Sequence, residues 1–188
     1  ASSARNLDWT AAGDLTLTGN YSAVGTVELS SSGGAISQTG GSVTTDLLAA
    51  KSATGVNLGG ANMINRVSRL QAVANDVALS NAKDLSITGD VAGRDVAITT
   101  TAGLLSVAPA GQVQATRDLT LTGATGFSSS SGAGGPVSSG RDLVVTATTG
   151  DAEAGWLTSS GSILVRALDG DAALRRATIT GGGALEIA

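Results

Sequence analysis

Aliphatic and polar residues alternate in short runs along most of the chain, as in Leu15-Thr16-Leu17-Thr18. An alternation of period two places successive side chains on opposite faces of a β-strand. The aliphatic members are therefore predicted to face a core and the polar members to face solvent. The predicted inward residues are Leu15, Leu17, Leu85, Ile87, Val96, Ile98, Leu119, Leu121, Leu143 and Val145. The predicted outward residues are Thr16, Ser86, Ala97, Thr120 and Val144.

These runs belong to a repeated phrase in which a small or basic residue and an aspartate precede the alternation. Copies occupy residues 13–18, 83–88, 94–99, 117–122 and 141–146, with a shorter copy at 75–79 and weaker ones at 161–165 and 183–187. Taking the residue before the first aliphatic as a marker, the steps run from 95 − 76 = 19 to 142 − 118 = 24 residues. Copies that fall between the markers, such as the one at Asp84, indicate two or more short strands in each step.

Strands this short do not form a stable isolated sheet. Stacking one coil on the next solves the problem, because each strand then pairs in parallel with its equivalents above and below. We therefore predict an all-β fold, a right-handed parallel β-helix (β-solenoid), as a single segment over residues 1–188. It should have about nine coils of 19–24 residues and, at ~4.8 Å per coil, form a rod about 40 Å long.

The aspartates before the strands are predicted to mark the corners of the coil, since Asp, Asn and Gly favour turns. Stacked carboxylates would repel one another. Arg94, Arg117 and Arg141 directly precede three of these aspartates and are expected to compensate their charge. The alternative interpretation of the aspartates is an acidic row that binds a ligand.

Two segments fit the repeat less well. Ile64, Val67, Leu70 and Val73 follow one another at a spacing of three, which suits either one face of a short helix that also includes Met63 and Ala74, or a strand that turns a corner. We favour the strand and corner, because a helix would interrupt the stack on both sides. Residues 127–140 are rich in Ser and Gly and contain Pro136, so we predict a loop extruded from one coil.

Composition agrees with a narrow, many-layered core. Hydrophobic residues make up 41% of the chain but aromatic residues only 2%, so the core must consist of small and branched aliphatics. The net charge of −4, without a basic cluster, argues against nucleic acid as a partner. No apolar run reaches the ~18 residues of a transmembrane helix.

The chain has no His and no Cys, which excludes Ser-His-Asp and Cys-His catalysis and a zinc or redox site built on these ligands. Its Gly-Gly pairs lack the Asp spacing of calcium-binding solenoids, and no phosphate-binding Gly-rich loop precedes a helix. We therefore predict no catalytic, metal-binding or cofactor-binding residues and no cofactor, and we do not expect an enzyme.

Three groups of residues are candidate exceptions. The pairs Asp151/Glu153 and Asp169/Asp171 could serve a polysaccharide-cleaving β-helix, which needs two carboxylates at ~5–10 Å, but we expect solvated turn residues instead. Ice-binding solenoids carry aligned Thr rows, whereas Thr is also simply a favoured outward strand residue. The Thr-x-Thr pairs are 16/18, 99/101, 120/122, 146/148 and 178/180. The aromatic residues that could stack on sugars, but are expected to fill corners or loop bases, are Trp9, Tyr21, Phe127 and Trp156.

The phrases at residues 12–19, 64–72 and 92–99 resemble shaft repeats of the filamentous haemagglutinin family, the large exoproteins of two-partner secretion in Gram-negative bacteria. The resemblance covers most of the chain. It implies a structural shaft segment of a secreted or cell-surface adhesin or exoprotein, and the family also includes biofilm proteins, haemolysins and toxin stalks. The Asn-Pro-Asn motifs of the family's secretion domain do not occur, which favours an internal piece of a longer chain.

The same resemblance implies the partners: neighbouring solenoid segments of a longer chain, the outer-membrane transporter during secretion, and glycans or receptors on a host or bacterial surface. A carbohydrate-active or carbohydrate-binding β-helix and an ice-binding solenoid remain the alternative functions. The sequence pattern identifies no ligand-binding residues.

Overall fold

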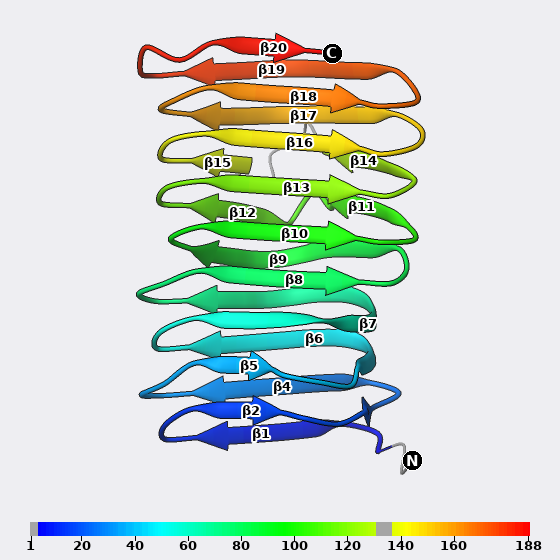
Figure 1. Cartoon of the computed structure of the whole chain (residues 1–188), viewed down its shortest axis with the longest axis vertical. Coiled ribbons are helices and arrows are strands. Elements are labelled where there is room, and N and C mark those ends of the chain that lie inside the picture. Colours follow the sequence, from blue (N-terminus) through cyan, green and yellow to red (C-terminus); the bar gives the residue numbers. More distant parts are fainter. Residues whose placement is uncertain (1–3, 131–136) are drawn as a thin grey trace.

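The computed structural model describes residues 4–130 and 137–188, and within them every regular element is a β-strand. The strands pair in parallel and stack as the coils of a β-solenoid, as the repeat predicts (Figure 1). From the N-terminus upward, strands at the front of Figure 1 run from left to right and those behind run from right to left. This winding is right-handed, as predicted.

One strand of each coil belongs to the front sheet, whose members stack in register along the axis. Val77 pairs with Val96, Val96 with Leu119, and Leu119 with Leu143. Besides the first part of β7 (Val56–Ala72), the front strands are β2 (Leu15–Leu17), β5 (Ile36–Gln38), β8 (Val77–Asn81), β10 (Val96–Thr100), β13 (Leu119–Gly123), β16 (Leu143–Ala147), β18 (Ile163–Ala167) and β20 (Leu185–Ile187).

The rest of each coil forms the rear sheet, either as one long strand or as two short strands with a turn between them. For example, β9 (Leu85–Gly93) is continuous, whereas the next coil meets it with β11 (Leu104–Val107) and β12 (Gln112–Ala115). Besides these three and the second part of β7, the rear strands are β1 (Leu7–Ala11), β3 (Tyr21–Ser22), β4 (Thr26–Ser31), β6 (Val43–Ser52), β14 (Gly126–Ser129), β15 (Val137–Ser139), β17 (Ala152–Ser159) and β19 (Ala172–Ile179).

The front-sheet registers confirm the predicted coil length of 19–24 residues, from 96 − 77 = 19 between β8 and β10 to 143 − 119 = 24 between β13 and β16. In the rear sheet the step from β14 to β17 is one residue longer, 152 − 127 = 25. The coil number needs a small correction. The described chain makes about eight turns, not nine. The prediction divided all 188 residues by an average coil length of about 21, whereas the turns of the structure run only from the first described strand to the last.

Aliphatic side chains form continuous columns inside the coils. All the predicted inward residues are buried except Leu15, which is half-buried in the first front strand. All the predicted outward residues are exposed or half-exposed. The stack fixes which side chains face inward. If one strand slipped by one residue, its aliphatic side chains would face solvent and its polar side chains would enter the core.

The segment whose apolar residues follow one another at a spacing of three belongs to the strand β7, so the helical alternative is wrong. Ile64, Val67 and Leu70 are buried, and relative to β6 the register shifts after Val67, where β7 has one extra residue. This bulge explains the spacing from Val67 to Leu70, whereas the spacing from Ile64 to Val67 is matched by that from Thr45 to Leu48 in β6. Val73 lies beyond the strand and is 75% exposed, so it does not belong to the inward set.

The predicted loop at 127–140 is shorter than expected at both ends. Phe127 to Ser129 belong to β14, and Val137–Ser139 form β15, which pairs with β12 and β17. Residues 131–136, the middle of the predicted loop, lie outside the described residues.

Candidate functional site

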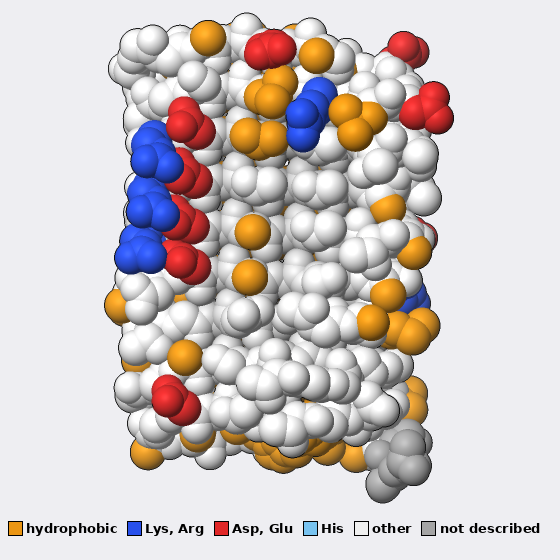
Figure 2. All heavy atoms as spheres, viewed as in Figure 1, with side chains coloured by type: hydrophobic (Ala, Val, Ile, Leu, Met, Phe, Trp, Pro, Cys, Tyr) orange, Lys and Arg blue, Asp and Glu red, His pale blue; other side chains and the backbone are white. Residues whose placement is uncertain are grey.

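The most regular chemical feature of the surface is a ladder of arginines and aspartates along the corner that precedes the front strands. Figure 2 shows it at the left edge of the front face as a column of blue side chains beside a column of red ones. We call this the corner ladder. Its arginines are Arg94, Arg117 and Arg141, and its aspartates are Asp76, Asp95, Asp118 and Asp142.

Each arginine of the corner ladder bonds chiefly to the aspartate of the preceding coil. Arg94 donates through Nε and Nη2 to both oxygens of Asp76, at 3.0 and 3.2 Å. Arg117 binds Asp95 in the same two-pronged way, with Nε at 2.6 Å. The contacts to the aspartate next in sequence are longer, as in the 4.0 Å between Arg94 and Asp95. The expected charge compensation is therefore present, and it acts between coils.

The same aspartates also join the backbones of neighbouring coils. Oδ1 of Asp76 accepts the backbone N–H of Asp95 at 3.3 Å, and Oδ1 of Asp142 accepts that of Ser162 at 2.9 Å. Asp14 holds Ala35 of the next coil in the same way, at 2.8 Å. Each of these corner aspartates thus accepts the backbone N–H of the residue at the equivalent position in the next coil.

Charge pairing shifts the pKa values of the central ladder groups. The hydrogen bonds from Arg117 hold the pKa of Asp95 below its ordinary value of 3.8, and those from Arg141 do the same for Asp118. The pKa values of Arg117 and Arg141 are raised by the carboxylates they bind. Three of the four ladder aspartates are therefore paired with an arginine of the next coil, and the fourth, Asp142, lies 3.7 Å from Arg141.

A buried polar column lies at the other end of the front strands, and sequence reasoning missed it. Asn62 and Asn81 are fully buried and in register with each other. Asn62 accepts the N–H of Val43 at 2.8 Å and donates to the carbonyl groups of Leu58 and Ser80, both at 3.0 Å. The available signal was that Asn81 continues the inward alternation of β8, although Asn is usually assigned to turns.

The candidate catalytic carboxylates lie at different places on the coils. Asp151 and Asp171 occupy equivalent corners, where Oδ1 of Asp151 accepts the N–H of Asp171 at 3.0 Å. Asp169 is exposed in the turn between β18 and β19. Glu153 points outward from β17. The structure thus gives Asp151 the same corner role as Asp14.

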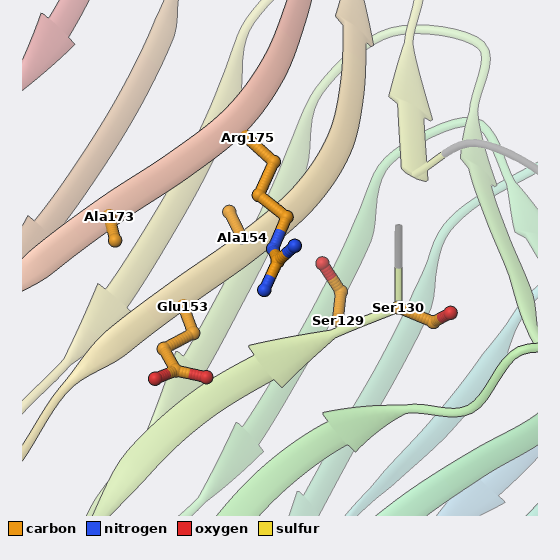
Figure 3. A pocket seen from close by; sticks show the side chains of 6 residues that line it. All are labelled: Ser129, Ser130, Glu153, Ala154, Ala173 and Arg175. Atoms are coloured by element: carbon orange, nitrogen blue, oxygen red, sulfur yellow. The ribbon is translucent and has the colours of Figure 1, made fainter. Parts of the chain in front are cut away.

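An open groove of about 340 Å³ lies on the rear side between β14, β17 and β19. Ser129, Ser130, Glu153, Ala154, Ala173 and Arg175 line it. In Figure 3 the guanidinium group of Arg175 extends toward the side chains of Ser129 and Glu153. The hydroxyl of Ser129 also accepts the N–H of Gly155 at 2.9 Å, which fixes its position. Hydroxyl, carboxylate and guanidinium groups therefore meet in one shallow depression.

The Thr-x-Thr pairs do not form one row. Thr16 is in register with Ser37, and Thr120 lies between Ala97 and Val144, so the outward column changes residue type from coil to coil. Thr146 is buried and accepts a hydrogen bond from Arg166. The pair at 178/180 begins in the rear strand β19.

The aromatic residues divide into core and surface. Phe127 is buried, and Trp9 packs edge-on against Tyr21 with ring centroids 4.6 Å apart at the first coil. Trp156 is half-buried beneath the guanidinium group of Arg176, which lies 4.3 Å from the ring centroid. Three of the four therefore fill corners or contact the core, as expected, and Trp156 carries a cation–π contact.

In the part of the chain that the structure describes, no three His, Cys, Asp or Glu side chains gather as a metal site would require. Over the same residues no helix has the length and apolarity needed to cross a membrane. Comparison of the chain with protein-family models, curated proteins and solved structures finds no match.

Proposed function

We propose that this chain is a structural shaft segment of a secreted or cell-surface bacterial exoprotein of the adhesin type, which holds other parts of the protein away from the cell. The observation that carries the proposal is that the polar contacts join each coil to the next along the rod. The corner ladder pairs charges between coils, and the corner aspartates bind the following backbone. Contacts of this kind need the same residue types at the same corner of successive coils. A catalytic site does not need such a repeat along the rod.

The partners proposed with this role are neighbouring solenoid coils, an outer-membrane transporter during secretion, and glycans or receptors on the surface reached. The corner ladder suits such exposure because three of its four aspartates are paired with arginines of the next coil. The proposed setting is the surface of a Gram-negative bacterium, and it rests on the resemblance of the repeats to two-partner secretion exoproteins.

Antibody labelling tests the proposed location. An antibody raised against the folded chain should label intact, unpermeabilised cells that produce it, and brief treatment of those cells with an external protease should remove the signal. Labelling that appears only after the cells are made permeable would contradict a surface shaft.

A second candidate function, carbohydrate binding, is favoured by the groove of Ser129, Glu153 and Arg175, because sugars are bound by convergent hydroxyl, carboxylate and guanidinium groups. Titration with neutral and uronic-acid oligosaccharides tests it. Binding that is lost in Glu153→Ala and kept in Asp90→Ala, an exposed carboxylate on β9, would support this candidate. No binding to any of these sugars would remove it.

The shaft proposal also includes the absence of catalysis. Release of reducing ends or unsaturated products from acidic polysaccharides should not exceed the blank. The doubly substituted Asp169→Asn/Asp171→Asn variant should behave like the wild type. Turnover that collapses in this variant would contradict the proposal, since a general acid or base contributes about 10²- to 10⁴-fold.

A further inference from the structure

The front sheet carries two large aliphatic residues on its solvent side. Val144 of β16 and Leu164 of β18 are in register with each other at outward positions, and both are half-buried. Each of these two strands pairs with a neighbour on both sides, so the position lies within the stack and not at an end of it. Figure 2 shows hydrophobic side chains gathered around one basic side chain in the upper part of the front face.

An arginine lies on one side of this aliphatic pair. Arg166 follows Leu164 by two residues along β18 and is exposed. Its Nε donates to Oγ1 of Thr146 in the coil below at 3.1 Å, so the guanidinium group reaches down to the level of β16. Arg166 forms no ion pair with any carboxylate in the part of the chain that the structure describes.

An aspartate lies on the other side. Asp142 precedes Val144 by two residues, and its side chain is 50% exposed. It is the one ladder aspartate without an arginine of the next coil, because Gly161 and Ser162 occupy the equivalent positions there. Arg141 lies 3.7 Å away but bonds more closely to the preceding ladder aspartate, at 2.6 Å. Asp142 can therefore accept a further cation. We call Asp142, Val144, Leu164 and Arg166 the front patch.

The charges of the front patch are placed symmetrically about its aliphatic column. Asp142 and Arg166 each lie two residues, about 7 Å, from this column, on opposite sides and with their charged groups at one level. A twofold axis that runs through the column parallel to the rod would bring Asp142 of each copy to Arg166 of the other. A twofold axis across the rod would instead set like charges against each other, and these repel.

The surrounding face allows two copies to approach. Beneath the front patch the aliphatic column continues with the small outward side chains of Thr120, Ala97 and Ala78. Two sheets pack face to face about 10 Å apart, a distance that lets their aliphatic side chains meet. Above the patch the same column holds the exposed Glu186, which lies at the rim, where water and salt screen its charge.

We propose that two copies of this chain pair side by side and in parallel through the front patch. Asp142 of each copy binds Arg166 of the other, and the aliphatic side chains of both copies are enclosed between these two ion pairs. The contact joins the same surface of both copies, so it closes as a dimer. The patch spans only two coils, so the dimer is weak. The inference does not depend on the proposed surface location.

Analytical ultracentrifugation at protein concentrations up to about 1 mM, the range of weak contacts, tests the pairing. The average mass should rise with concentration above that of the 18.2-kDa monomer, and high salt should reduce the rise. Arg166→Glu and Asp142→Arg each place like charges together twice in the dimer. Each substitution should therefore weaken the association about tenfold or more.

An equimolar mixture of these two variants tests the pairing of charges directly. In a mixed dimer the two substituted side chains face each other with opposite charges, and the native Asp142 and Arg166 form the second pair. The mixture should therefore associate to within about threefold of wild type, although each variant alone associates weakly. Pairing about an axis across the rod would not give this recovery, because position 142 would then meet position 142.

Lys51→Glu is the matched control for Arg166→Glu, because it reverses a positive charge at an exposed position on β6, away from the front patch. It should leave the association unchanged. Far-UV circular dichroism checks that each variant is folded, since Asp142 also holds the backbone N–H of Ser162. A wild-type chain that stays monomeric at every concentration, a control that weakens association as much as Arg166→Glu, or a mixture no stronger than its components would each overturn the proposal.

Discussion

Asn62 and Asn81 occupy inward positions where later coils have a hydroxyl or a small side chain. Asn81 is in register with Thr100, and Gly123 and Ala147 follow at the same position in the next two coils. Burying an amide is tolerated because its donors and acceptor all find partners. Asn81 accepts the N–H of Ile64 at 2.8 Å and donates to its carbonyl at 3.0 Å. The Asn81 side chain thus takes the place of a neighbouring strand as hydrogen-bond partner for the N–H and carbonyl group of Ile64.

Replacing Asn62 by Ala should lower the free energy of unfolding by about 2 kcal/mol or more. The change leaves the N–H of Val43 and the carbonyl groups of Leu58 and Ser80 without this partner, and each buried unsatisfied group costs about 1–3 kcal/mol. Urea unfolding followed by circular dichroism measures the loss. Asn57→Ala, at an exposed position in the same strand β7, is the control and should stay within about 0.5 kcal/mol of wild type.

The corner ladder makes stability depend on pH. Asp95 and Asp118 have folded-state pKa values below 3.8, so in the folded state they release protons more readily than in the unfolded chain. Their contribution to stability is fully present above about pH 4 and is lost as the pH falls through the lower folded-state values. Asp95→Asn/Asp118→Asn should therefore be less stable than wild type at pH 7, and the difference should shrink as the pH falls below 3.8.

Urea midpoints of both proteins across this range measure that difference. High salt at pH 7 should narrow it as well, because the ladder is partly exposed and screened by ions. Asp169→Asn, in an exposed turn, is the control and should show no such trend. A difference between wild type and the ladder variant that stays constant from pH 7 down to acid would rule out the charge pairs as its cause.

At the scale of elements, the turns between strands are as constrained as the strands. Gly41, between β5 and β6, has φ of +70°, and a Cβ added there would overlap the carbonyl group of Gly19 in the coil below. The turn can approach the previous coil this closely only because it carries no side chain.

Gly41→Ala should therefore cost about 1–3 kcal/mol, the usual cost of a strained backbone position. Gly13→Ala is its partner experiment, since a Cβ at Gly13 has no atom within 4 Å and its φ is not in the left-handed region. That change should be neutral to within about 0.5 kcal/mol. Equal losses in the two variants would mean that glycine content in general, and not this contact, determines stability.

The whole molecule is a quasi-one-dimensional stack, so a complete coil should be removable. Ile98 of β10 is in register with Leu121 of β13. Deleting residues 98–120 joins Ala97 to Leu121 and preserves the alternation of the front strand. The shortened protein should fold, because repeats contact mainly their neighbours.

Deleting one residue more, 98–121, joins Ala97 to Thr122 instead and places a polar side chain inside the core. This variant should be far less stable or fail to fold, because a slip of one residue reverses the two faces of the strand. Thermal unfolding of the two deletions gives the comparison. Similar midpoints would contradict a fold held by register.

Much of the fold follows from particular sequence features. The aspartates before Val77, Val96, Leu119 and Leu143 mark four successive corners, and the register of the front strands places these four aliphatics directly above one another. The loop at 127–140 was less well predicted. Ser-rich sequence indicates a turn, yet Ser128 and Ser129 pair as a strand because Leu105 to Val107 offer them an edge.

The sequence by itself determined which side chains face inward and how long each coil is. Alternation has only two possible phases, and only one of them buries Leu, Ile and Val. The tertiary structure decided the partners. Arg117 lies next to Asp118 in the chain, yet stacking at the inter-strand spacing brings it within 2.6 Å of Asp95, one coil earlier. The strand identity of β7 and the burial of Asn62 likewise depend on coils about twenty residues away, whose contacts no local pattern contains.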